Sequence, residues 1–161
     1  MADDSPSPKL PALDPETVDV WTGSTYPEPF AAECRARRKQ ALGDAAGLEN
    51  FGVNLVRMAP GVWSSQRHWH SAQDEFVYIL EGEVVLITDA GEQTLGPGMA
   101  AGFPAGSGDG HHLVNRSDAD AVYLEVGDRR AGDDVDYPDI DMAARWLDGV
   151  REFVRKNGTP Y

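Results

Sequence analysis

The sequence predicts an all-β protein whose strands close into a small barrel around a metal site. Two strand-length apolar runs, Glu75–Leu80 and Val84–Thr88, are rich in β-branched and aromatic residues and are separated by a glycine-containing turn. His68 and His70 precede these runs and stand one residue apart. Alternate residues of an extended strand point to the same face, so both imidazoles can approach one ion while Trp69 points away.

Length and composition indicate one soluble domain. A chain of 161 residues with 41% hydrophobic residues suits a single core of ordinary size. Acidic residues outnumber basic ones by 27 to 14, and the net charge of -13 opposes binding to nucleic acid or to an anionic membrane. Cys34 is the only cysteine, so no internal disulfide can form, which is compatible with a reducing cytosol. We therefore expect a cytoplasmic protein without nucleic-acid or membrane partners.

Residues 1–16 are interpreted as a flexible N-terminal lead. They are rich in proline and acidic residues and lack the apolar segment of a signal peptide. The longest apolar stretches of the chain are strand-sized, far shorter than the ~20 residues that a membrane-spanning helix needs. Neither targeting nor membrane insertion is predicted.

An N-terminal extension is predicted over residues 17–50. It begins as a loop and continues into a short surface helix over Ala31–Leu42, where alanines and basic residues favour a helix. The basic residues of this helix are Arg35, Arg37, Arg38 and Lys39. This cluster has two interpretations, a nucleic-acid contact or a solvated, ion-paired helix face, and the acidic excess of the chain favours the second.

The barrel itself is predicted over residues 51–127. Its first strand, Phe51–Met58, carries apolar residues on both faces, as does a strand packed on both sides, and it is a candidate edge strand joined to a second subunit. Glu75 opens the next long strand, where its carboxylate can reach the same ion as the histidines. That strand ends at Gly82, because glycine permits a turn without steric cost.

A strand over His111–Asn115 supplies a candidate fourth ligand. Within it, His111 and Leu113 share one face, while His112 and Val114 share the other. We expect His111 to point inward, with His112 as the rival for that position.

A C-terminal extension is predicted over residues 128–161. It starts as an acidic, loop-like segment, and its last part has two interpretations. Asp141 can cap a helix that reaches Leu147, or Val150–Val154 can form a strand. We expect this tail to wrap over its own barrel or over a partner's.

The chain resembles the cupin superfamily in two motifs. The first combines a glycine, a His-x-His pair, a glutamate and a second glycine, which are here Gly61, His68, His70, Glu75 and Gly82. The second combines a glycine, a Pro-x-Gly turn, a histidine and an asparagine, which are here Gly98, Pro104, Gly106, His111 and Asn115. The chain departs from these motifs by one extra residue between Gly61 and His68 and by the four residues 107–110, where two are usual. The resemblance covers residues 51–127.

This resemblance implies a fold, a ligand set and an assembly. The fold would be a cupin double-stranded β-helix, or jelly-roll barrel, with N-terminal and C-terminal extensions. By the same resemblance, the four metal ligands would be His68, His70, Glu75 and His111, and the chain would pair as a homodimer.

Three imidazoles and one carboxylate leave two positions open on a six-coordinate ion. Such a mixed nitrogen and oxygen set suits one divalent transition metal, and the sequence does not choose among Fe, Mn, Ni, Co and Zn. The open positions would hold a substrate oxygen or dioxygen. Gln66, Gln73 and Asn115 have the right chemistry to orient the imidazoles.

The leading functional hypothesis is a metal-dependent enzyme acting on a small polar substrate, dioxygenase-like first and isomerase or lyase second. Its candidate catalytic residue is Glu75, as a carboxylate that leaves the metal to accept a proton. Arg57 and Arg67 are the candidates for an arginine in the barrel mouth, which would favour a carboxylate or a phosphate. The alternative hypothesis is a non-catalytic module that binds or senses a small ligand. A third is a structural barrel without metal, because a fold alone does not define a function.

Overall fold

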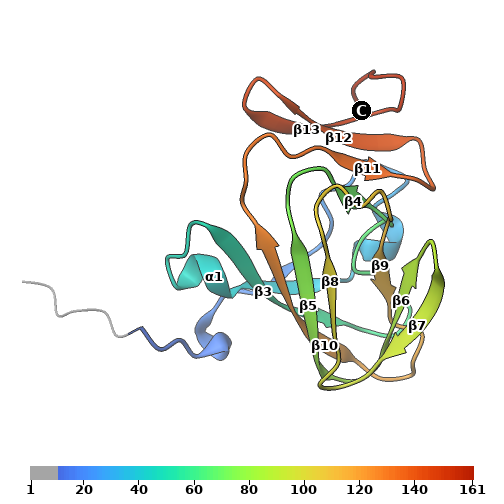
Figure 1. Ribbon diagram of the computed structural model, residues 1–161. Coiled ribbons are helices and arrows are strands. Elements are labelled where there is room, and N and C mark those ends of the chain that lie inside the picture. Colours follow the sequence, from blue (N-terminus) through green and yellow to red (C-terminus); the bar gives the residue numbers. More distant parts are fainter. Residues whose placement is uncertain (1–10) are drawn as a thin grey trace, which may run out of the picture.

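The structure, a computed structural model, describes residues 11–161 (Figure 1). Its elements are η1 Pro15–Thr17, β1 Trp21–Thr22, η2 Ala32–Cys34, β2 Arg38–Ala41, α1 Leu42–Ala45, β3 Phe51–Met58, β4 Trp69–His70, β5 Glu75–Glu81, β6 Val84–Thr88, β7 Gly91–Leu95, β8 Ala100–Phe103, β9 His112–Val114, β10 Ala121–Asp128, β11 Val135–Tyr137, β12 Met142–Leu147 and β13 Val150–Val154. Residues 1–10 of the predicted flexible lead lie outside the described residues. Within residues 11–161, no helix is long and apolar enough to cross a membrane.

Two antiparallel sheets face each other and enclose the main core. The larger sheet has the strand order β1-β2-β3-β10-β5-β8, and the smaller one has the order β7-β6-β9. Inward side chains of both sheets form one buried cluster, which includes Val56 of β3, Ile79 of β5, Leu86 of β6, Leu113 of β9 and Tyr123 of β10. The prediction of an all-β jelly-roll barrel is therefore confirmed.

The helix predicted over Ala31–Leu42 is wrong. A single 3-10 turn, η2, is followed by the strand β2, which pairs with β3, and the short helix α1 begins only at Leu42. The alternation of β2 points Lys39 toward Glu125, with 3.3 Å between its Nζ and the carboxylate. Helix propensity is a weak local preference, and pairing with a strand of the sheet outweighs it.

Strand β3 is internal to the larger sheet, so its assignment as a candidate edge strand is also wrong. It pairs with β10 on one side and with β2 on the other. Only the inner face of β3 is fully covered, because Val56 and Met58 are buried while Phe51 on the other face is 42% exposed. The neighbour on its second edge is β2, the segment that had been assigned to a helix.

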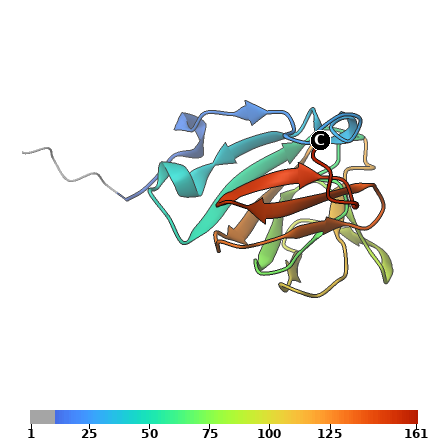
Figure 2. The same ribbon diagram turned by 90° about the horizontal axis from the view of Figure 1, so that it is seen from above.

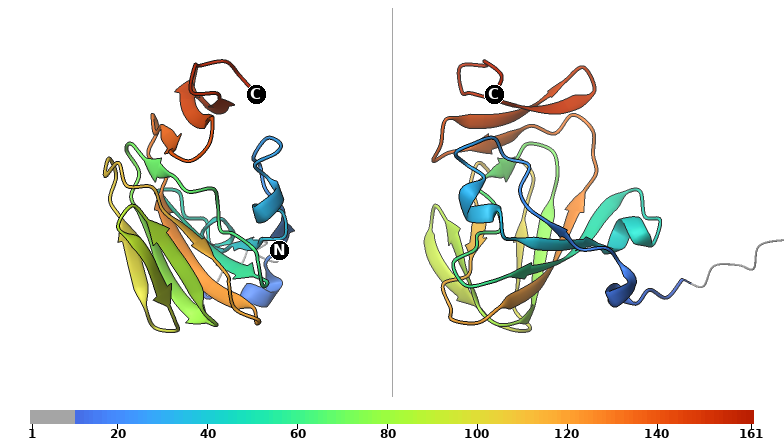
Figure 3. Two further views of the ribbon diagram at one scale, coloured as in Figure 1. Left: turned by 90° about the vertical axis from the view of Figure 1, so that its right-hand side faces the viewer. Right: turned by 180° about the vertical axis from the view of Figure 1, so that it is seen from behind.

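The C-terminal extension forms a third sheet across one end of the barrel. Its strand order is β13-β12-β11-β4, so it is hydrogen-bonded to the strand that carries His70. Asp148 and Gly149 both have positive φ, 50° and 85°, which suits the two-residue turn that joins β12 to β13. The strand interpretation of Val150–Val154 is confirmed, and the helix interpretation is wrong. Figures 2 and 3 show that the C-terminal strands β11–β13 lie over the end of their own barrel, while the segment from β1 to η2 runs along one side.

The turn at Gly82 depends on the missing side chain. Gly82 has a φ of +71°, and a Cβ atom there would lie 2.3 Å from the backbone oxygen of Asp120. Glycine is thus required both by the backbone conformation and by the close approach of the 120–121 segment.

Candidate metal centre

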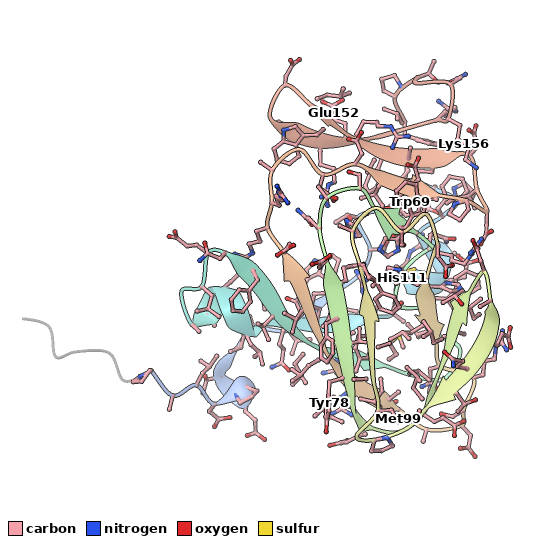
Figure 4. The ribbon with its side chains drawn as sticks, viewed as in Figure 1. Trp69, Tyr78, Met99, His111, Glu152 and Lys156 are labelled. Carbon is pink, nitrogen blue, oxygen red and sulfur yellow. The ribbon has the colours of Figure 1, made fainter. Side chains whose placement is uncertain are left out.

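The predicted metal ligands come from three segments that meet at the end of the barrel under the C-terminal sheet. His68 and His111 are paired across two strands and exchange both backbone hydrogen bonds, at 3.1 and 2.8 Å. His70 lies in β4, and Glu75 opens β5. The label of His111 in Figure 4 marks this interior position, which lies below Trp69.

The four side chains converge on the carboxylate of Glu75. Its Oε2 lies 2.8 Å from Nε2 of His111 and 3.4 Å from Nε2 of His68, and its Oε1 lies 3.4 Å from Nε2 of His70. The ligand atoms of His68, His70 and Glu75 all lie within 4.8 Å of one another. Neighbouring ligand atoms around an octahedral ion with bonds near 2.1 Å are separated by about 3.0 Å, so these spacings suit a single ion.

The imidazoles of His68 and His70 are held by acceptors at their Nδ1 atoms. Nδ1 of His68 donates to the backbone oxygen of Gln66 at 2.8 Å, and Nδ1 of His70 donates to Oδ2 of Asp133 at 2.6 Å. A neutral imidazole that donates from Nδ1 presents a lone pair at Nε2. Both lone pairs are directed at the carboxylate oxygens of Glu75, and a cation between them would satisfy every one of these acceptors.

Electrostatics in the cluster also favours a positive charge there. Burial raises the pKa of Glu75, but the neighbouring His111, His68 and His70 outweigh it and hold the pKa well below its ordinary value. Burial lowers the pKa of His70, yet Glu75 and Asp133 outweigh it and raise that pKa above its ordinary value. An ionised carboxylate, the lone pairs and their spacing together fit a divalent metal ion.

Asp133 orients His70, and the sequence did not reveal it. Its side chain is fully buried. Its Oδ1 accepts hydrogen bonds from the backbone nitrogens of Ala72 and Gln73 at 2.9 and 3.1 Å, and its Oδ2 also accepts one from Arg151 at 2.6 Å. In the sequence, Asp133 stands in an acidic, loop-like segment far from the histidines, and no local pattern marks it as a partner of His70.

The side chains predicted to orient the imidazoles make other contacts. The amide nitrogen of Gln66 donates to the backbone oxygen of Phe30, and that of Gln73 donates to the backbone oxygen of Arg130. The amide of Asn115 is buried and ties the turn before β10 by donating to the backbone oxygens of Met58 and Ala119. Gln66 instead holds His68 through its backbone oxygen, and Gln73 holds Asp133 through its backbone nitrogen.

His111 and His112 face opposite sides of their strand. The ring of His111 lies beside Glu75 and stacks on Phe103, with centroids 3.6 Å apart. His112 points the other way, where its Nδ1 lies 3.0 Å from the backbone oxygen of Ser65 and its ring meets Trp63 edge-on at 4.8 Å. The structure thus brings His111, and not its rival, to the cluster.

The cluster forms one wall of a cavity of about 360 Å³, a volume typical of small-molecule sites. Apolar walls come from Val77, Phe103, Leu113 and Tyr137. Polar lining residues outside the cluster include Ser24, Thr25, Tyr26, Arg37, Asn54, Ser64, Ser65, Gln73, Glu125, Arg129 and Arg151.

Neither arginine named from the sequence lines this cavity. Arg57 lies on the outer face of the larger sheet, 3.5 Å from Asp120. Arg67 is bound by Asp139 and Asp89 beyond the opposite sheet. The arginines that do line the cavity lie in the two extensions and at the end of β10, segments that the sequence motifs do not cover.

Comparisons with known proteins agree with this architecture. A family model for the Cupin domain matches residues 54–127. A crystal structure of a sugar phosphate isomerase of the cupin superfamily from Silicibacter pomeroyi is 46% identical, with a TM-score of 0.89, covering 94% of this chain and 96% of that one. A protein from Acidithiobacillus ferrooxidans proposed to be a sugar phosphate isomerase is 30% identical, with a TM-score of 0.71, covering 78% of this chain and 80% of that one.

A more distant neighbour shares the fold alone. It is the polyketide cyclase RemF from Streptomyces resistomycificus, 22% identical with a TM-score of 0.61, covering 76% of this chain and 81% of that one. A comparison with curated proteins gave no match. The near full-length similarities and the family model establish that the chain belongs to the cupin superfamily.

Proposed function

We propose that this protein is a metal-dependent isomerase that acts on a phosphorylated sugar. The observation that carries the proposal is the similarity over nearly the whole of both chains to the sugar phosphate isomerase from Silicibacter pomeroyi. The site supports it, because a cluster suited to a divalent metal shares a cavity with the cationic side chain of Arg37. Such a cavity matches a substrate with a carbonyl or hydroxyl at one end and an anion at the other.

Interconversion of an aldose and a ketose transfers a hydrogen between neighbouring carbons. His68, His70, Glu75 and His111 would hold the metal, which when bound polarises the substrate carbonyl as a Lewis acid. We propose Glu75 as the group that leaves the metal to accept and return the proton, because it is the carboxylate on which the three imidazoles converge. Phe103 packs flat against His111 and fixes the ring that meets this carboxylate.

This proposal reverses the order of the two enzyme hypotheses drawn from the sequence. A dioxygenase-like activity would use the same ligands, but the similarity to a sugar phosphate isomerase over nearly the whole chain favours isomerisation. The non-catalytic alternative, a module that binds a small ligand, would use the same cavity without turnover. These three hypotheses differ in what they do to substrate and to dioxygen.

The test incubates the metal-loaded protein with a panel of phosphorylated aldoses and ketoses in D₂O and follows the sugars by NMR. We expect interconversion of at least one aldose and ketose pair, at equal rates in air and under argon, and no interconversion of the same sugars without their phosphate. Deuterium incorporated at the reacting carbon would support proton transfer through Glu75. Sugar phosphates that bind without interconverting would refute the isomerase in favour of a binding module, and substrate-dependent consumption of dioxygen would favour a dioxygenase.

We also propose a homodimer that uses the outer face of the larger sheet. Three large hydrophobic residues on alternate positions of β5, Phe76, Tyr78 and Leu80, have exposed fractions of 43%, 39% and 40%. Leu124 and Val126 of β10 lie beside Tyr78 and Phe76 in register and extend the same face. A contiguous exposed apolar face is typical of a protein contact, and a two-fold axis lets a second copy cover it. Figure 4 shows Tyr78 at the far end of the barrel from the C-terminal sheet.

The variant Tyr78→Glu tests this interface. We expect it to weaken dimerisation at least tenfold, because the two-fold axis places a desolvated carboxylate from each subunit in the contact. Sedimentation equilibrium measures the dissociation constant. The control is Val150→Glu, since Val150 is 60% exposed on the C-terminal hairpin and lies outside this face. A monomeric wild-type protein, or a Tyr78→Glu variant that dimerises normally, would disprove the interface.

The proposed setting is the cytoplasm, without nucleic-acid or membrane partners. Cys34 is a free, buried cysteine, which is compatible with a reducing compartment. The net charge of -13 further supports this view, because it disfavours polyanionic partners.

A further inference from the structure

We propose that Arg37 binds the phosphate group of the substrate. This inference rests on the proposed function and adds to it the residue that recognises the anionic end of the sugar.

The backbone fixes Arg37 at the wall of the cavity. Its nitrogen donates to the backbone oxygen of Cys34, and its oxygen accepts from the nitrogen of Gly23, each at 3.1 Å. These bonds hold it where η2 leads into β2, beside the segment Ser24–Tyr26 that lines the same cavity. The guanidinium carbon lies 5.9 Å from the ring centroid of Trp21, so the ring covers one side of the cation.

Arg37 differs from the other arginines of the cavity because its charge is unpaired. Arg129 pairs with Asp44, and Arg151 pairs with Asp133. Among residues 11–161, no carboxylate lies within ion-pair distance of Arg37, whose one hydrogen-bond acceptor is the backbone oxygen of Ser64, bound through Nη1. In a protein with a net charge of -13, a cation left unpaired in a cavity marks a place for an anion.

The hydrogen-bonding edge of Arg37 lacks an acceptor as well. Its Nε is buried and has no partner. A buried donor without an acceptor is costly, so natural structures rarely keep one without a reason. Nε is closed to solvent, so a phosphate in the cavity would meet the terminal nitrogens of the guanidinium, where Nη2 has no acceptor among residues 11–161.

A short polar chain connects Arg37 with the candidate metal centre. Arg37 binds the backbone oxygen of Ser64, the hydroxyl of Ser64 lies 3.4 Å from that of Ser65, and the hydroxyl of Ser65 lies 3.3 Å from Nδ1 of His68. The unpaired cation and the metal ligands therefore share one wall. A phosphorylated sugar bound by its phosphate at Arg37 would extend along this wall toward Glu75.

The test measures binding of inorganic phosphate to the metal-loaded protein by isothermal titration calorimetry. We compare the wild type with Arg37→Met, which keeps an unbranched apolar stem and removes the cation. The affinity is expected to fall at least tenfold, because the cation and its charge-assisted hydrogen bonding are lost. The matched control is Arg129→Met, which removes a paired arginine from the same cavity and is expected to change the affinity by less than about twofold.

Each outcome of this test bears on Arg37 separately from the activity. An unchanged affinity in Arg37→Met, or affinity lost in His70→Ala but kept in Arg37→Met, would overturn the proposal, since phosphate would then bind elsewhere or on the metal. If Arg37→Met does not fold by circular dichroism, Arg37→Lys takes its place, with an intermediate loss expected because the charge remains and the fork does not. If phosphate binding depends on Arg37 but the protein isomerises no phosphorylated sugar, the assignment of Arg37 as the anion site stands and only the proposed function is refuted.

Discussion

Replacing His111 with alanine is expected to lower the affinity for a divalent metal by more than about 100-fold and to abolish isomerisation. Loss of a group that merely orients a ligand already costs about 10 to 100-fold in metal affinity, so loss of a ligand should cost more. His111 is the cluster member closest to the carboxylate of Glu75, at 2.8 Å, and contributes one of three converging Nε2 atoms. Without His111, the remaining ligands of the ion would be His68, His70 and Glu75.

The adjacent histidine provides the matched control. His112 is as buried as His111, with an exposed fraction of 5% against 7%, but its ring points to the other face of the strand. We expect His112→Ala to keep its metal and, at most, to lose stability. Elemental analysis of protein purified without a metal-affinity tag gives the metal content, and competition with a chelator gives the affinity. If His112→Ala loses the metal and His111→Ala retains it, the ligand assignment is refuted.

Most residues of the candidate site could be predicted from the sequence, because the alternation of side chains along a strand decides which of them share a face. The alternation of a strand places His68 and His70 on one face, and the same rule separates His111 from His112. The loop 107–110 did not disturb that register, because it folds outward, where Asp109 accepts a hydrogen bond from the backbone of Asp89. Local alternation therefore separated the two faces, and the resemblance to cupins supplied the choice of His111 over His112.

What the sequence did not predict depends on contacts between distant segments. Asp133 reaches His70 across 63 positions of the chain, and Arg37 enters the cavity through a segment whose composition favoured a helix. The strand β2 forms because β3 offers it a free edge, which no local pattern shows. Likewise, Asp148 and Gly149 were taken as a helix interruption, although the same pair suits a hairpin turn once both flanking strands exist.

The second large effect is expected from Asp133→Asn, a nearly isosteric change one step away from the metal ligands. The asparagine oxygen can still accept the backbone hydrogen bonds of Ala72 and Gln73, so its amide nitrogen would take the place of Oδ2. That nitrogen is a donor and faces Nδ1 of His70, which is also a donor. His70 would then move its proton to Nε2, the atom that carries the lone pair toward the ion. We expect the metal affinity to fall by about 10 to 100-fold.

A loss of metal affinity in Asp133→Asn could also come from a weakened fold. Removing Arg151, the other side-chain partner of Asp133, distinguishes the two explanations. Arg151→Met breaks the ion pair at Oδ2 and leaves the contact with His70 in place. If Asp133 acts by setting the tautomer of His70, Arg151→Met should keep a metal affinity within about threefold of the wild type even where its melting temperature falls, because the carboxylate still accepts from Nδ1. NMR of the imidazole nitrogens reports the tautomer directly in both variants. A His70 that keeps its proton on Nδ1 in Asp133→Asn, or a metal affinity that follows the melting temperature in both variants, would show that Asp133 supports the fold and not the ligand.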